Sequence, residues 1–141
     1  MTQGEMTQDV TQAVEVDAPP DRVWHLLTDP AQLPRWWPDA AELEPRVGGR
    51  IVLKFGPGAV SGEITTWEPP GALGFTWIQS NMPGVELHVS FRVDDLGDGR
   101  SRVSVVHSGF EGAPAEAREA VVGGWANFLP RLVQVAREEQ A

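Results

Sequence analysis

The sequence contains no cysteine and no tyrosine among its 141 residues. Without thiols the chain has no disulfide, no cysteine nucleophile and no thiolate ligand for a metal. The missing tyrosines remove the aromatic side chain that carries an ionisable hydroxyl, so the six Trp and five Phe are expected to serve packing and stacking. Much catalytic chemistry is therefore excluded, and no cofactor is expected.

Basic residues are scarce, with 11 Lys and Arg against 20 Asp and Glu, for a net charge of −9. This charge repels phosphate backbones and anionic lipid headgroups, so neither nucleic acid nor a membrane is an expected partner. An acidic surface could dock on a basic protein partner. No apolar stretch approaches the ~20 residues that cross a bilayer, and the start of the chain lacks signal-peptide features, which predicts a cytoplasmic location.

Turn signals dominate the middle of the chain. Between residues 40 and 108, Gly- and Pro-rich turns recur about every 8 to 14 residues, a spacing typical of consecutive hairpins. The segments between them alternate apolar and polar residues, which predicts about six antiparallel strands with one apolar face. A further strand is predicted over residues 10–16, giving a sheet of about seven strands.

Three segments are predicted to be helical. Pro20 to Thr28 forms a short helix because Pro is tolerated in a first helical turn, and a second short helix follows from Asp29 through about Trp36. After Pro114 apolar residues recur every three or four positions, predicting a long helix over 115–138. Pro130 lies inside that pattern, so a kink, or a division into two segments, is expected near residues 126–130.

This order of elements predicts one α+β domain over residues 1–141, with residues 1–9 frayed. A large sheet with one apolar face needs a cover, and only the last helix is long enough to supply it. The predicted architecture is therefore a helix-grip fold: a curved antiparallel sheet of about seven strands wrapped round a long C-terminal helix, with two short helices after the first strand.

Several segments, in this order, also resemble the START-like (SRPBCC) superfamily, which includes the Bet v 1-like proteins. They are Val23-Trp24 with Leu27-Thr28-Asp29-Pro30, Trp36-Trp37-Pro38, Val47-Gly48-Gly49-Arg50, Gly62-Glu63-Ile64, Pro69-Pro70 with Phe75-Thr76-Trp77, the run from Arg102 to Phe110, and Gly124-Trp125. Within the superfamily the chain is similar to homologues of the activator of the heat-shock protein 90 ATPase, over nearly its whole length. The resemblance implies co-chaperones, carriers of hydrophobic ligands, polyketide aromatase/cyclases and natural-product resistance proteins as relatives, so it leaves the function open.

Aromatic and apolar residues on the expected inner faces predict an internal cavity of about 300–1,000 Å³. The candidate ligand-binding residues are Trp36, Trp37, Phe55, Phe75, Trp77, Leu87, Phe91, Val105, His107, Trp125 and Phe128. Of the adjacent pair Trp36 and Trp37, one is expected to point inward and the other to cap the cavity or face a partner. The alternative is that these rings fill the space themselves and leave no cavity.

His107 is the one candidate for chemistry. It shares strand parity with Val103 and Val105, which places its imidazole on the inner face. It could donate a hydrogen bond to a ligand, act as a general base, or be a core histidine tied to the protein itself. His25 and His88 are expected on the surface, and no metal site is predicted because the three histidines are dispersed without a carboxylate at ligand spacing.

The leading hypothesis is a non-catalytic protein that carries, senses or sequesters a hydrophobic, aromatic small molecule in its cavity. One alternative is an enzyme of the polyketide cyclase or aromatase type that uses His107 to move a proton. The other is a co-chaperone-like interaction protein that acts on a heat-shock ATPase through its surface.

Overall fold

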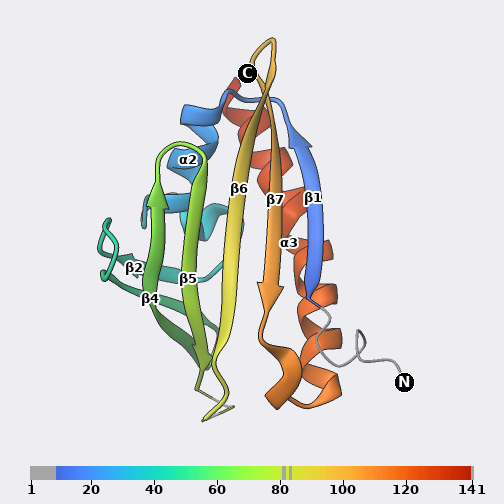
Figure 1. The fold of residues 1–141 in the computed structure, drawn as a ribbon. Coiled ribbons are helices and arrows are strands. Elements are labelled where there is room, and N and C mark those ends of the chain that lie inside the picture. The colour runs from blue at the N-terminus through green and yellow to red at the C-terminus, as the bar shows by residue number, and fades with distance from the viewer. Residues whose placement is uncertain (1–8, 81, 83, 141) are drawn as a thin grey trace.

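A computed structural model describes residues 9–140 apart from 81 and 83, so the fraying predicted for the first residues lies almost wholly outside the described part. The chain forms one seven-stranded sheet with a long helix against it (Figure 1). In chain order the elements are β1 (Val10–Val16), α2 (Pro20–Thr28), η1 (Leu33–Arg35), β2 (Ala40–Leu43), β3 (Arg50–Phe55), β4 (Gly58–Glu68), β5 (Ala72–Gln79), β6 (Leu87–Gly97), β7 (Arg100–Ser108), η2 (Phe110–Gly112) and α3 (Ala115–Gln140).

The strand order is β1-β7-β6-β5-β4-β3-β2, and every neighbouring pair is antiparallel. From β2 to β7 each strand pairs with the next in the chain, as the recurring turns predicted. In β7 the buried residues are Ser101, Val103, Val105 and His107, and the residues between them are more exposed. The predicted inner parity of His107 is therefore confirmed.

The long helix α3 lies against one face of the sheet and supplies five side chains to the core (Figure 1). These are Trp125, Leu129, Leu132, Val135 and Ala136. The helix is continuous from Ala115 to Gln140, through Gly123, Gly124 and Pro130, so the division into two segments does not occur. The curved sheet and its long helix confirm the helix-grip fold.

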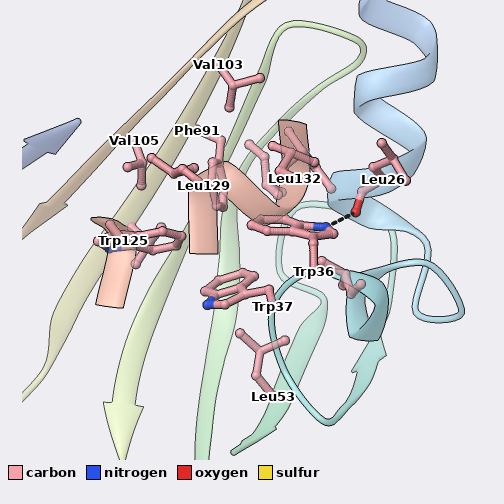
Figure 2. Packing of buried hydrophobic residues seen from close by; sticks show 14 of the residues in the cluster. Leu26, Trp36, Trp37, Leu53, Phe91, Val103, Val105, Trp125, Leu129 and Leu132 are labelled. Atoms are coloured by element: carbon pink, nitrogen blue, oxygen red, sulfur yellow. Dashed lines mark hydrogen bonds between the residues drawn. The ribbon is translucent and has the colours of Figure 1, made fainter. Parts of the chain in front are cut away.

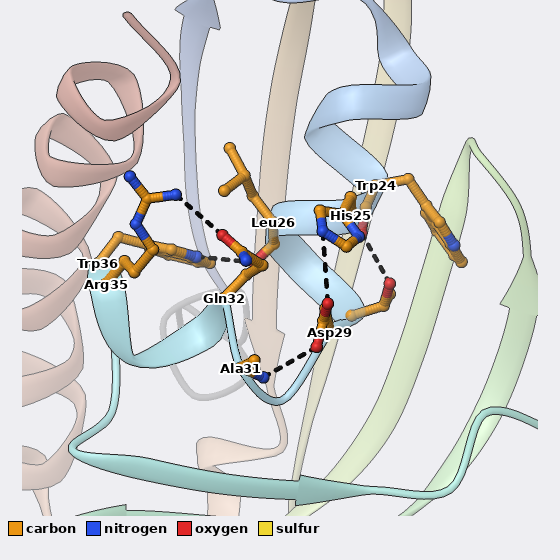
Figure 3. A network of polar contacts seen from close by, with 9 residues as sticks. Trp24, His25, Leu26, Asp29, Ala31, Gln32, Arg35 and Trp36 are labelled. Atoms are coloured by element: carbon orange, nitrogen blue, oxygen red, sulfur yellow. Dashed lines mark hydrogen bonds and ion pairs between the residues drawn. The ribbon is translucent and has the colours of Figure 1, made fainter. Parts of the chain in front are cut away.

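The segment after α2 is shorter than predicted. Instead of a second α-helix, residues Leu33–Arg35 form a single 3₁₀ turn. The amides of Trp36 and Trp37 both donate to the carbonyl of Leu33, at 3.2 and 3.0 Å, so the chain closes one turn and does not propagate a helix. Figure 3 shows how this turn is tied to α2: Trp36 Nε1 donates to the Leu26 carbonyl at 2.9 Å.

Both tryptophans of the pair are buried, so of the two positions expected for the second ring, capping the cavity or facing a partner, the outward one does not occur. Trp36 is fully buried and Trp37 is 5% exposed. Their rings stack with centroids 5.4 Å apart, and Trp36 also packs edge-on against Phe91 (Figure 2). The short turn explains this arrangement, because it directs two adjacent bulky side chains into the same space between the sheet and α3.

Two glycines with open space around them allow a matched stability prediction. Gly123 lies inside α3, and a Cβ there would meet nothing within 4 Å. We expect Gly123→Ala to raise the free energy of unfolding by about 0.5–1 kcal/mol, because Ala loses less backbone entropy in a helix. Gly48 is equally open but has φ +84°, so Gly48→Ala should cost about 1 kcal/mol. Urea unfolding measures both, and a change of the same sign in the two variants would contradict this interpretation.

Candidate functional site

A pocket of about 960 Å³ opens between the N-terminal half of α3 and one end of the sheet. Its volume lies within the range expected from the sequence. The strand side is formed by the β3–β4 turn and by the ends of β5 and β7. The lining residues are Trp37, Phe55, Pro57, Gly58, Ala59, Val60, Trp77, Gln79, Ser80, Met82, His107, Pro114, Glu116, Ala117, Ala120, Val121, Gly124, Trp125 and Phe128.

The structure divides the predicted ligand-binding residues into two groups. Six of them line this pocket: Trp37, Phe55, Trp77, His107, Trp125 and Phe128. The other five lie outside the lining and pack in the hydrophobic core: Trp36, Phe75, Leu87, Phe91 and Val105. Strand parity places all of the strand residues among them on the inner face, but only those near one end of the sheet reach the pocket.

The predicted set lacked the lining residues of the β3–β4 turn, of the end of β5 and of α3, and the small residues on α3 are the ones among these that shape the pocket most directly. Ala117, Ala120 and Gly124 face the pocket from the same side of the helix as Trp125 and Phe128. Their spacing of three and four residues places them on one face of the helix with Trp125 and Phe128, and this spacing could have identified them from the sequence. Because their side chains are short, α3 leaves space here, whereas the larger apolar residues of its C-terminal half fill the core.

Aromatic rings form much of the pocket wall, and Trp37 lies at their centre. Its ring centroid is 4.9 Å from that of Trp125, 5.9 Å from that of Trp77 and 6.1 Å from that of Phe55. The Trp77 ring is nearly parallel to Trp37, at 20°, while the other two are tilted or edge-on. Such a wall can stack on a flat aromatic guest.

His107 is almost fully buried and bonds to the long helix. Its Nδ1 accepts a hydrogen bond from Trp125 Nε1 at 3.1 Å, so in the neutral ring the proton is on Nε2. Burial lowers the pKa of His107 from 6.5 to about 3, with a smaller contribution from His88. Within the described part of the chain, Nε2 has no hydrogen-bond partner. The ring is therefore a neutral group with one unused N–H donor.

The remaining polar groups of the lining are few. Gln79 Oε1 accepts from Trp77 Nε1 at 2.9 Å, and Ser80 Oγ accepts from the Ala59 amide at 3.2 Å. Glu116 is the one lining residue, among those described, that carries a charge near pH 7. The pocket thus offers an apolar wall with scattered hydrogen-bonding groups and an acidic residue.

The other two histidines lie away from the pocket. On the surface of α2, His25 Nε2 lies 3.3 Å from Asp29 Oδ2 (Figure 3). The Nε2 atom of His88 forms a hydrogen bond with Thr65 Oγ1 at 2.8 Å. In the described part of the chain no three His, Asp or Glu side chains come close enough to hold a metal ion.

Comparison with protein families identifies the class of protein that this fold and pocket represent. The family model described as "Activator of Hsp90 ATPase homolog 1-like protein" matches residues 17–137. The chain therefore belongs to this family, within the START-like superfamily that its sequence resembled. No curated protein matches it.

Two of the similar solved structures each share 27% sequence identity with this chain, at a TM-score of 0.78. CalU16 from Micromonospora echinospora matches over 95% of this chain and 79% of its own. DynU16, a protein in the dynemicin biosynthetic locus, matches over 89% of this chain, which spans only 46% of DynU16. Protein MLL2253 from Mesorhizobium loti shares 25% identity at a TM-score of 0.80, over 91% of this chain and 97% of its own.

Within the described residues, no helix is long and apolar enough to cross a membrane.

Proposed function

We propose that this protein binds an uncharged, mostly apolar aromatic molecule in the pocket beside α3 and carries, senses or sequesters it without chemical change. The observation that carries the proposal is the pocket itself, of about 960 Å³ with Trp37, Trp77 and Trp125 in its wall. Small-molecule sites are typically concave, apolar and of this size, with a few polar groups that orient the guest.

The state of His107 favours binding over catalysis. A general base works best with a pKa near the working pH, whereas the pKa of His107 is about 3. The lone pair at Nδ1 is used by Trp125, and Nε2 carries a proton. A ring in this state donates a hydrogen bond well and accepts a proton poorly, which weakens the cyclase alternative.

Surface features favour the pocket over a co-chaperone-like role. Among the described residues, the large apolar side chains that are exposed are Val47, Ile78, Leu96 and Val122. They lie on four different elements or loops. Protein interfaces usually centre on a contiguous cluster of buried anchors, and scattered single residues do not make one.

The relationship to DynU16 supports a natural product as the guest. That protein belongs to a biosynthetic locus, shares 27% identity with this chain and has the same fold. A pocket lined with rings suits the polycyclic skeletons that aromatic polyketide pathways make. Among the three proposed roles, sequestration of such a compound would protect a producing cell.

A pair of leucine variants on α3 tests the proposal. We expect the wild-type protein to bind N-phenyl-1-naphthylamine, a neutral fluorescent aromatic probe, saturably at one site. Gly124→Leu should weaken binding by about tenfold or more, because its side chain enters the pocket that the probe needs. Gly123→Leu is the matched control, since Gly123 is exposed and outside the lining, and it should bind as wild type does.

Fluorescence titration gives both affinities, and thermal melts check that the two variants are folded. Equal affinities in Gly124→Leu and Gly123→Leu would place the probe elsewhere on the protein. Absence of saturable binding to the wild type would count against the proposed function itself.

A further inference from the structure

Two N–H donors in the pocket wall have no acceptor within the described part of the chain. Three of the four buried tryptophans use their indole nitrogens: Trp36 bonds to Leu26, Trp77 to Gln79 and Trp125 to His107. Trp37 does not: it is 5% exposed and lies among Trp36, Trp125 and Leu53 (Figure 2), and its nitrogen is not one of the fully buried unpaired atoms. The second donor is Nε2 of His107.

His107 gives the stronger signal of the two. Its side chain is 1% exposed, and its Nδ1 is already paired with Trp125. Buried polar groups in proteins are nearly always paired, and one left unpaired costs free energy comparable to a lost hydrogen bond. His107 belongs to the pocket lining, and its Nε2 itself exposes less than 1 Å², so an acceptor atom on a bound guest satisfies Nε2 when the neighbouring rings shift to admit it.

The charges of the wall restrict what that acceptor can be. A carboxylate or phosphate needs a cation or several donors to offset its desolvation. In the described lining no Lys or Arg occurs, and Glu116 would repel an anion. A neutral oxygen, as in a ketone, quinone or ether, accepts from an N–H without this penalty.

From these contacts we infer that the guest is an uncharged, planar aromatic compound with a ketone- or quinone-type carbonyl, whose oxygen accepts a hydrogen bond from His107 Nε2. Its ring system stacks on the Trp37 and Trp77 side of the pocket, and the Trp37 indole N–H is available to a second oxygen. This assignment rests on the proposed function and adds to it the functional group that is recognised.

The matched probes 9-fluorenone and fluorene test the assignment, since they share a flat tricyclic skeleton and differ by one carbonyl oxygen. Their affinities are measured by displacement of N-phenyl-1-naphthylamine. In a pocket without donors fluorene binds more tightly, because the carbonyl gives up its hydrogen bonds to water. We expect the wild type instead to prefer fluorenone by about fivefold, the effect of one hydrogen bond.

Replacement of the donor should remove this preference. In His107→Phe, which keeps an aromatic ring but has no N–H, we expect fluorenone to bind no better than fluorene. Trp37→Phe should leave the preference for fluorenone in place, since this carbonyl is assigned to His107. Comparing the two probes within each variant cancels any general loss of affinity.

A measurement on the unaltered protein covers the case in which His107→Phe does not fold. With ¹⁵N-labelled histidine, the chemical shift of His107 Nε2 should change on saturation with fluorenone. The change on saturation with fluorene should be much smaller. Equal or reversed affinities in the wild type, with no shift of Nε2 by fluorenone, would overturn the carbonyl assignment and leave the binding function standing. Failure of both fluorene and N-phenyl-1-naphthylamine to bind would overturn the binding function.

Discussion

Replacement of Gly62 by alanine should destabilise the protein by about 3 kcal/mol or more, the upper part of the range for overpacking. Gly62 lies in β4, and a Cβ there would be 1.8 Å from the Thr76 carbonyl oxygen and 2.7 Å from its carbon. Both atoms belong to the backbone of β5, so relief requires the two strands to separate. Glycine in a strand marks such a close backbone approach.

Gly58→Ala is the control for this prediction because it lies in the same strand. A Cβ at Gly58 would meet the Phe55 carbonyl oxygen at 3.7 Å and Ser80 Oγ at 3.8 Å, which are ordinary contacts. Urea unfolding should therefore show little change for Gly58→Ala and a greatly lowered midpoint for Gly62→Ala. A free energy of unfolding for Gly62→Ala within 1 kcal/mol of that of wild type would contradict the close approach of β4 and β5.

The stability of the protein should depend on pH through His107. Its pKa is about 3 in the folded state and 6.5 when unperturbed, so the folded state favours the neutral ring. As pH falls below 6.5 the unfolded chain takes up a proton that the folded protein does not, and stability is lost progressively down to about pH 3. At pH 5 the loss is about 2 kcal/mol, from about 1.36 kcal/mol for each pH unit below 6.5.

His107→Phe isolates this contribution, since it removes the titrating group and leaves the others. Between pH 7.5 and pH 5 the free energy of unfolding of wild type should fall by about 2 kcal/mol more than that of the variant. The variant also leaves Trp125 Nε1 without its acceptor. The free energy of unfolding lost in this way is the same at both pH values, so it cancels in the comparison. Parallel pH profiles for the two proteins would show that His107 titrates normally in the fold.

Ligand binding, in contrast, should be insensitive to pH between 5 and 8 as far as His107 is concerned. With a pKa of about 3, the ring remains neutral over that interval and its Nε2 remains a donor. Titration of N-phenyl-1-naphthylamine at pH 5 and pH 8 measures this directly. A loss of affinity at pH 5 in wild type that is absent from His107→Phe would mean that protonation of the ring interferes with the guest.

The strands and the long helix could be predicted from local patterns. Turn residues and period-two alternation depend on neighbours in the chain, so β1 and α2 were predicted with their observed bounds, Val10–Val16 and Pro20–Thr28. Where the prediction was wrong, tertiary packing intervened. Residues Leu33–Arg35 close one 3₁₀ turn, because this conformation places both Trp36 and Trp37 in the core.

The pocket was predictable only in part. Parity identifies which face of a strand is buried, and it correctly placed Trp77, Val105 and His107 there. It says nothing about position along the strand relative to α3, and for that reason Val105 packs in the core while His107, two residues later, lines the pocket.

The sequence by itself determined the strand and helix pattern, the buried face of each element and the chemical types present: many rings, no thiols and a single inward histidine. These follow from propensity and periodicity, which act over a few residues. The tertiary structure alone decided that short side chains of α3 face the ring cluster and leave a pocket, and that Trp125 takes up His107 Nδ1. Both depend on contacts between residues on separate elements. Burial by these contacts lowers the pKa of His107, and the bond from Trp125 fixes its tautomer and leaves Nε2 as the donor.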